Sequence, residues 1–393
     1  MQQLSYLGFG ILGLTSTIHG MALPFLIEEY SLTLSVAGLL LFANSFGYLL
    51  ASVAFPFLQK RRPSARILSV AFLIIAVTYT LFPLSPWWAL AVALGFLASL
   101  GTGTIDVGFN TLISSLDPEK AQPALNWLHF SYGIGALVGP IFLSRFAYFG
   151  LSWSAFYFST SILATLFVLL WRNYLGTTVN NKSSTAPRAN TLKLYKQAPY
   201  WMLLVSIFIY VAVEVALVGW VPTLLTSLGV RAVNASLGIS VLWLGIALGR
   251  ALCTQAVKKM SSRVLLLFLT SSTALAMLVL IFIQPLWLVF TMLFTIGLFL
   301  SAIFPLILFH SSSLFPMCVA ESTSGLVVAG SFGAMVGPAF LGLIGQHYSL
   351  HTGVAILAGV MLLSTLILAL VPQELSQSLE LAPSNKTGAK VTD

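Results

Sequence analysis

Two acidic residues lie inside long apolar stretches of the sequence, where a carboxyl group is unusual. Asp106 has Thr102 four residues before it and Asn110 four residues after it, which puts all three on one face of a helix. Glu214 lies in another apolar stretch, one helical turn after Tyr210. An acid at membrane depth costs about 2.5–3.5 kcal/mol on insertion scales, and dehydration favours its neutral form. The two carboxyls therefore predict proton binding, substrate binding or both; the alternative is that each is a hydrogen-bonded packing residue.

Other polar and aromatic side chains in the apolar stretches are candidates for contact with a solute. Aromatic faces stack on sugar rings or on flat apolar molecules, although many membrane tryptophans anchor a helix at the bilayer interface instead. A lone histidine in a helix is often a satisfied packing residue. The candidate substrate-binding residues are Asn110, Asn126, His129, Tyr210, Trp220, Asn44 and His19.

The composition indicates that the solvent of this chain is lipid. Of its 393 residues, 58% are hydrophobic and 7% are charged, whereas a soluble domain carries about 25% charged residues. The net charge of +8 lies in particular loops between apolar stretches, which argues against nucleic acid as a partner. The sequence has no phosphate-binding GxxxxGK[ST] loop, no Gly-x-Ser-x-Gly elbow and no Cys/His spacing for a metal. We therefore expect neither an enzyme nor a cofactor or metal.

The apolar stretches predict an all-α membrane protein with twelve transmembrane helices. They divide into a six-helix bundle over residues 1–172, a cytoplasmic linker at 173–198, a second six-helix bundle over 199–372 and a disordered cytoplasmic tail at 373–393. The predicted spans lie near 5–27, 34–58, 66–84, 87–113, 124–148, 152–172, 199–226, 233–257, 264–284, 286–310, 323–346 and 352–371. A short polar turn, Asp117 to Lys120, is expected before the fifth span.

The basic residues predict the orientation of these spans. With the N-terminus inside, fifteen of the eighteen Lys and Arg residues lie in cytoplasmic loops or in the tail. Only Arg145 and Arg231 lie outside, and Arg250 lies within a span. Because basic residues concentrate in cytoplasmic loops, both termini are predicted to be cytoplasmic.

The two halves of the sequence repeat each other. Residues 135–143, GALVGPIFL, reappear at 333–341 as GAMVGPAFL, with seven of nine identical at an offset of 333 − 135 = 198. The same offset pairs Pro24 with Pro222 and Lys60 with Lys258. A duplicated six-helix unit relates its halves by a pseudo-two-fold axis along the membrane normal, as in transporters that rock two bundles around a central site. The small residues at four-residue spacing permit close helix packing, and the prolines bend the helices. These structural residues are Gly135, Gly139, Pro140, Gly333, Gly337 and Pro338.

Several short motifs resemble those of the major facilitator superfamily, in particular the branch of fucose–proton symporters and related glucose carriers. The motifs are Gly101-x-Gly103-x-x-Asp106-x-x-x-Asn110, Leu125-Asn126-x-x-His129, Tyr210-x-x-x-Glu214, Gly219-Trp220-x-Pro222, Gly249-Arg250 and Ile303-Phe304-Pro305. The stretch before Lys60 departs from the family pattern, because it lacks the Gly and Asp that precede the basic cluster.

The resemblance implies a proton-coupled secondary transporter that works by alternating access on a small neutral solute, with a sugar or polyol as first choice. Its driving force would be the proton gradient, with sodium as a possible substitute. The main alternative is proton-driven efflux of drugs or lipophilic metabolites, and a remote one is a non-transporting sensor or channel. Arg250, Lys258 and Lys60 are candidates for gating. We expect a monomer in the bacterial inner membrane, with the lipid bilayer and a small-molecule substrate as its partners.

Overall fold

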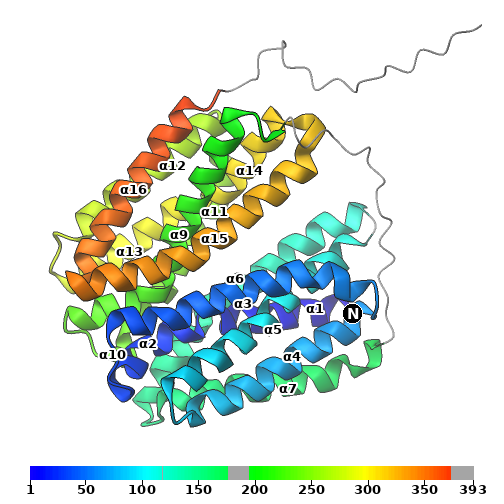
Figure 1. The fold of residues 1–393 in the computed structure, drawn as a ribbon, viewed down its shortest axis with the longest axis vertical. Helices are drawn as coiled ribbons and strands as arrows, with labels where there is room; N and C mark the ends of the chain where they lie inside the picture. The colour runs from blue at the N-terminus through cyan, green and yellow to red at the C-terminus, as the bar shows by residue number, and fades with distance from the viewer. Residues whose placement is uncertain (117, 176–193, 373–393) are drawn as a thin grey trace, which may run out of the picture.

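The computed structural model describes residues 1–116, 118–175 and 194–372, and this part of the chain is helical without strands (Figure 1). Most of the predicted linker and the whole predicted tail lie outside these residues. The first half contains α1 (Gln2–Ser16), α2 (Ile18–Glu29), α3 (Leu34–Gln59), α4 (Ser64–Leu81), η1 (Phe82–Leu84), α5 (Trp88–Ser114), α6 (Pro118–Tyr148), α7 (Trp153–Trp171) and η2 (Arg172–Tyr174). The second half contains α9 (Ala198–Ser227), α10 (Ala232–Ala235), α11 (Leu237–Ala256), α12 (Ser262–Leu280), α13 (Leu286–Leu300), α14 (Ile303–Leu314), η3 (Pro316–Cys318), α15 (Val319–His347) and α16 (Leu350–Leu370).

Within the described residues, twelve helical segments are long and apolar enough to cross a membrane, and they coincide with the predicted spans. The largest difference at a boundary is at the start of the fifth span. The expected polar turn before the fifth span is shorter than predicted, because α6 begins at Pro118. Proline suits the first position of a helix, where its missing N–H would have had no partner.

Large apolar side chains cover much of the outside of the molecule. Phe57, Leu84, Phe282 and Leu366 are between 63% and 82% exposed, and many other leucine, valine and phenylalanine side chains are also exposed. A water-soluble monomer rarely exposes such continuous apolar surface. In a bilayer this surface contacts lipid tails, which confirms the all-α membrane fold predicted from the composition.

The helices form two bundles with the same internal packing. In the first bundle, α1–α7, α1 packs on α6, α3 on α5 and α4 on α7. In the second bundle, α9–α16, α9 packs on α15, α11 on α13 and α12 on α16. Figure 1 shows the two bundles as separate groups, in blue to green and in green to red.

Close helix contacts repeat between the bundles atom by atom. A Cβ added to Gly135 would overlap the carbonyl oxygen of Gly10, and one added to Gly333 would overlap that of Phe208. The two glycines are 198 residues apart, and so are the two residues whose carbonyls they approach, since 333 − 135 = 198 and 208 − 10 = 198. In the same way, Gly47 approaches the carbonyl of Phe96, and Gly245 approaches that of Phe294. The repeat found in the sequence is therefore also a repeat of backbone contacts. Glycine is required at these positions because a Cβ would overlap the carbonyl oxygen of the neighbouring helix.

Within the described residues, the hydrogen bonds that join the two bundles lie from the central cavity toward one of the two ends of the molecule. Leu34 N–H donates to Gln346 Oε1 at 2.8 Å and Ser45 Oγ donates to the Ala334 carbonyl at 2.9 Å. On the other side of the pseudo-axis, Ser236 and Ser240 donate to the carbonyls of Pro140 and Leu137 at 3.3 Å and 2.7 Å. We call this the closed end. From it the bundles diverge toward the end that holds the N-terminus (Figure 1). Lys60 and Lys258 lie at this open end, because they follow the ends of α3 and α11 that are opposite to Leu34 and Ser240.

Two of the spans are interrupted near their middle, which the sequence analysis did not predict. Between α1 and α2, the hydroxyls of Thr15, Ser16 and Thr17 donate to the carbonyls three residues before each of them, an arrangement that bends helices. Between α13 and α14, Pro305 has no N–H to give to the carbonyl of Ser301 four residues earlier. Both interruptions lie beside the cavity described next.

Candidate functional site

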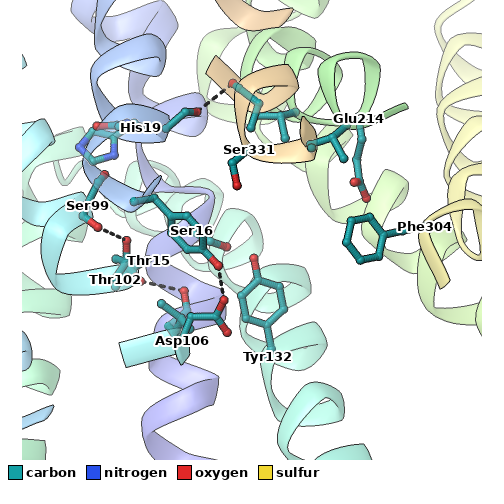
Figure 2. Close-up of a pocket in the computed structure, with 18 of the residues that line it drawn as sticks. Thr15, Ser16, His19, Ser99, Thr102, Asp106, Tyr132, Glu214, Phe304 and Ser331 are labelled. Carbon is teal, nitrogen blue, oxygen red and sulfur yellow. Dashed lines mark hydrogen bonds between the residues drawn. The ribbon is translucent and has the colours of Figure 1, made fainter. Parts of the chain in front are cut away.

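A cavity of about 450 Å³ lies between the two bundles. Its walls come from α1 to α6 on one side and from α9, α11, α14 and α15 on the other. Figure 2 shows Asp106 and Glu214 on opposite sides of this cavity. Six of the predicted residues line it: Asp106, Glu214, His129, Asn44, His19 and Arg250.

Asp106 is held by two side-chain donors. The Tyr48 hydroxyl on α3 donates a hydrogen bond to Asp106 Oδ2, and Asn110 Nδ2 donates to Asp106 Oδ1 at 2.8 Å. Donors of this kind favour the charged carboxylate, whereas dehydration favours the neutral acid. The protonation state of Asp106 therefore depends on the hydration of the cavity and on whether the hydrogen bond from Tyr48 is kept. Thr102, on the same helix face, donates instead to the Ser99 carbonyl at 3.1 Å.

Two residues of α6 lie beside Asp106. The His129 ring makes an edge contact with Phe9, with the ring centroids 5.5 Å apart, and lies within electrostatic range of Asp106 and Arg250. Tyr132, three residues later, is within range of both Asp106 and Glu214. Figure 2 shows the Tyr132 ring beside Asp106. Tyr132 thus lies between the two acids.

Glu214 faces a different environment on α9. Arg250 on α11 is its nearest source of positive charge, and Figure 2 shows its carboxyl beside the Phe304 ring. The Nε of Arg250 donates to the carbonyl of Ser301 at 3.3 Å. This carbonyl cannot accept the usual helical hydrogen bond from the residue four positions later, because that residue is Pro305. The break between α13 and α14 therefore positions the cation that acts on Glu214.

His19 and Asn44 bring two unpartnered polar atoms to the same part of the cavity. His19 is 5% exposed and its ring lies among those of Tyr79, Phe82 and Tyr157, with centroids 5.2–5.9 Å apart. His19 Nε2 and Asn44 Oδ1 are buried without a hydrogen-bond partner. A Cβ on Gly95 would lie 2.9 Å from Asn44 Oδ1 and 3.5 Å from His19 Nε2. A buried polar atom without a partner is costly, so this recess suits a ligand with hydroxyl groups or water.

The remaining predicted residues lie outside the cavity lining. Asn110 acts through Asp106. Tyr210 is 2% exposed; its hydroxyl donates to the Leu300 carbonyl at 3.3 Å and lies beside the Glu214 carboxyl, so Tyr210 acts through Glu214. Trp220 is 1% exposed and its Nε1 donates to the Pro338 carbonyl at 2.8 Å, so its side chain packs α9 against α15 instead of facing a solute.

Asn126 is exposed on α6 away from the cavity. Lys60 and Lys258 are exposed at the ends of α3 and α11, and Lys60 lies over the Phe57 ring at 5.7 Å.

The sequence analysis missed Ser16, Tyr132 and Ser331 and named Phe304 only as part of a family motif; all four line the cavity. The offset of 198 could have found two of them. Ser16 is the repeat partner of Glu214, and Phe304 is the repeat partner of Asp106. Each acid thus occupies a cavity position at which the other bundle has an uncharged side chain.

Two helical bundles around a shared central cavity, with one carboxyl on each side, are an arrangement typical of transporters. Residues 5–331 match the Major Facilitator Superfamily, and this chain belongs to that family. The predicted membership is confirmed. The proteins of the family and the relatives found are transporters, not enzymes.

Two curated relatives are named as sugar transporters. The glucose/mannose transporter GlcP of Bacillus subtilis (strain 168) is 23% identical over 342 residues, which cover 84% of each chain. The sodium-dependent glucose transporter 1 of Rattus norvegicus is 27% identical over 137 residues, 35% of this chain and 28% of the relative.

Solved structures share the fold at low identity. The D-xylose-proton symporter has a TM-score of 0.74 at 15% identity, covering 95% of this chain and 97% of its own. A bacterial homolog of the human lysosomal transporter Spinster, in an inward-facing and occupied conformation, has a TM-score of 0.77 at 14% identity, covering 94% and 96%. At this level the likeness concerns the fold alone.

Proposed function

We propose that this transporter couples the movement of a small neutral sugar or polyol to the proton gradient by alternating access. The observation that carries the proposal is the composition of the central cavity. It contains one carboxyl from each bundle, Asp106 and Glu214, and the unpartnered polar atoms of His19 and Asn44. No further cofactor is needed.

The lining of the cavity suits an amphipathic ring. The first bundle contributes His19, Asn44 and Ser45. The second contributes Val211, Val215, Phe304 and Val327 over much of its surface. A sugar ring has hydroxyl groups for the first wall and C–H faces for the second, where an aromatic ring such as Phe304 can stack on it. The glucose/mannose transporter among the relatives supports a sugar as the substrate class.

Asp106 and Glu214 divide the work of coupling in this proposal. A ligand shifts a conformational equilibrium only through different affinity for the two states. A proton on either carboxyl removes the charge that attracts its partners: the hydroxyl of Tyr48 for Asp106, and the guanidinium of Arg250 for Glu214. Because each acid belongs to a different bundle, protonation changes the contacts of both bundles with the central cavity.

The orientation follows from the distribution of basic residues. If the end with Lys60 and Lys258 is cytoplasmic, the closed end faces outward and the cavity faces the cytoplasm. The chain would then span a bacterial inner membrane with both termini inside and act as a monomer.

The test is transport by the purified full-length chain in liposomes. Glucose, mannose, xylose and a polyol are offered as radiolabelled solutes under an imposed pH gradient, an imposed sodium gradient, or neither. Accumulation above equilibrium under the pH gradient alone is the expected result. Accumulation under the sodium gradient alone would show that sodium, not the proton, is the coupling ion. Sodium is a specific alternative because the rat relative is named as a sodium-dependent transporter.

Efflux of a lipophilic solute is the second candidate, and the apolar side chains of the second bundle in the cavity favour it. Cells that lack the gene distinguish the two. Loss of growth on a sugar supports uptake, whereas new sensitivity to lipophilic drugs supports efflux. If no sugar or polyol is moved in liposomes while a lipophilic cation is extruded, the sugar proposal is wrong.

A further inference from the structure

A second cavity, of about 310 Å³, lies at the closed end of the molecule. Ser144, Arg145 and Tyr148 at the end of α6 line it from the first bundle. Arg231 and Asn234, at the beginning of the α10 region, line it from the second. It lies beside the contacts that Ser236 and Ser240 make with the carbonyls of α6. The cavity therefore crosses the interface that opens and closes in alternating access.

Two arginines face this cavity without an opposite charge. No acidic side chain lines it. Among the residues that the structure describes, neither the Arg145 nor the Arg231 guanidinium has a hydrogen bond or an ion pair. Two like charges around one small space repel each other. An anion between them would remove this repulsion and use the planar hydrogen-bonding face of each guanidinium.

The position of these arginines is also unusual in the sequence. They are the only two of the eighteen basic residues that the charge distribution places on the outer side. Basic residues are disfavoured there, yet both are found in the same cavity and come from different bundles.

The pseudo-symmetric interface provides an internal comparison. The offset of 198 places Thr33 at the position of Arg231, and Leu343 at the position of Arg145. There the bundles are joined directly by the 2.8 Å hydrogen bond from Leu34 N–H to Gln346 Oε1. Both equivalent interfaces thus have direct hydrogen bonds between the bundles. The interface on the side of α6 and α10 has in addition a cavity with two unpaired positive charges.

We infer that the cavity of Arg145 and Arg231 binds a phosphate-type oxyanion that joins the two bundles at the closed end. Ser144, Tyr148 and Asn234 supply further hydrogen-bond donors. The same chemistry is present in a phospholipid headgroup and in free phosphate. Tyr148, which is 77% exposed, lies at the mouth where a lipid would approach. Because both arginines reach one anion only when the bundles meet here, binding favours the state in which the central cavity opens at the other end.

The experiment uses the purified full chain in dodecyl maltoside micelles, which contain no phosphate. Cysteines introduced at the exposed Leu84 and Phe282 carry spin labels on the two bundles at this end, in a background in which the buried Cys253 and Cys318 are replaced by serine. Inorganic phosphate is titrated at constant ionic strength, and phosphatidylglycerol is titrated separately against diacylglycerol. The population at the short label distance should rise saturably with phosphate, with phosphatidylglycerol, or with both. A response to the lipid alone identifies the headgroup as the source, and a response to free phosphate alone identifies a soluble anion.

Arg145→Gln and Arg231→Gln are the test variants. Each should raise the half-saturating concentration about tenfold or more, since a charge-assisted hydrogen bond is lost. Arg172→Gln, at the opposite end of the first bundle, is the matched control and should respond as wild type. Calorimetry of phosphate binding to the same proteins gives a readout that does not depend on the labels. The inference is overturned if neither probe binds saturably, or if the two test variants bind as the control does. The experiment involves no sugar and no proton gradient, so its result is independent of the proposed transport function.

Discussion

Arg250 Nε donates a hydrogen bond to the carbonyl of Ser301 at 3.3 Å, across the break between α13 and α14. The acceptor exists because Pro305 cannot donate an N–H to it. The sequence feature Ile303-Phe304-Pro305 therefore has a structural consequence at the cavity. It holds a cation near Glu214, and it ends α13 where the Leu300 carbonyl can accept the Tyr210 hydroxyl.

Pro305→Ala tests this relationship. The new N–H at position 305 can bond the Ser301 carbonyl and extend the helix, so that Arg250 loses its partner. We expect a folded protein whose rate of sugar exchange falls about tenfold, the size of effect that losing one charge-assisted hydrogen bond produces. Pro56→Ala is the control, because Pro56 is exposed on α3 away from the cavity. Equal exchange rates in both variants would show that the break does not position Arg250.

Tyr48→Phe tests the hydrogen bond to Asp106. The substitution removes one donor to the carboxylate and leaves the ring in place. Losing a donor makes the charged form less favourable. Proton-driven uptake should therefore persist to higher pH than in the wild type, which a pH profile of initial rates in liposomes measures. Tyr6→Phe is the control, because Tyr6 accepts a hydrogen bond from Gln2 on the same helix and does not line the cavity. An unchanged profile in Tyr48→Phe would exclude Asp106 from the rate-determining protonation.

Gly135→Ala and Gly333→Ala test the repeated helix contacts. In both, the new methyl group meets a carbonyl oxygen of the neighbouring helix, and overpacking of this kind costs about 1–3 kcal/mol or more. The two variants should lower the thermal unfolding temperature by similar amounts, because the contacts are equivalent. Gly133→Ala and Gly359→Ala have open space at the Cβ position and should behave as wild type. A loss confined to one half would contradict the equivalence.

The fold was predictable from the sequence because lipid restricts the choice of structure. Apolar runs of about 20 residues can only be spanning helices, and the offset of 198 relates their arrangement in the two halves. The cavity was only partly predictable. Asp106 and Glu214 stand out because charge is rare in these runs, whereas Tyr132 and Phe304 look like ordinary packing residues until the helices are placed in space.

Trp220 and Tyr210 are the opposite case: the sequence predicted that they bind substrate, but they lie outside the cavity lining. Both have residue types that bind sugars, and both lie in motifs of the family. Their polar groups nevertheless contact protein atoms: Trp220 Nε1 donates to the Pro338 carbonyl, and the Tyr210 hydroxyl lies beside the Leu300 carbonyl and the Glu214 carboxyl. The sequence does not say which side chains meet those carbonyls. The partner of a buried polar group is a property of the tertiary structure.

The membrane orientation can be tested with reporter fusions. Fusions at Lys196 and after Asp393 should both report the cytoplasm, because fifteen of the eighteen basic residues are predicted on that side. A fusion in the loop at Phe282 should report the opposite side, since α12 separates it from Lys258. An outside signal at either of the first two positions would invert the proposed direction in which the cavity opens.

Asp106→Asn and Glu214→Gln test the coupling mechanism directly. Each amide keeps the shape and most of the hydrogen bonding of the acid but cannot titrate. Both variants should remain folded and inserted, and Glu28→Gln, at an exposed acid near the end of α2, is the matched control. At least one of the two should abolish accumulation against a gradient while keeping downhill exchange of labelled sugar. This separation is expected because the proton supplies energy only if its binding differs between the two conformations. If both amide variants concentrate sugar as well as the wild type and Glu28→Gln do, then Asp106 and Glu214 are packing residues and another group carries the coupling ion.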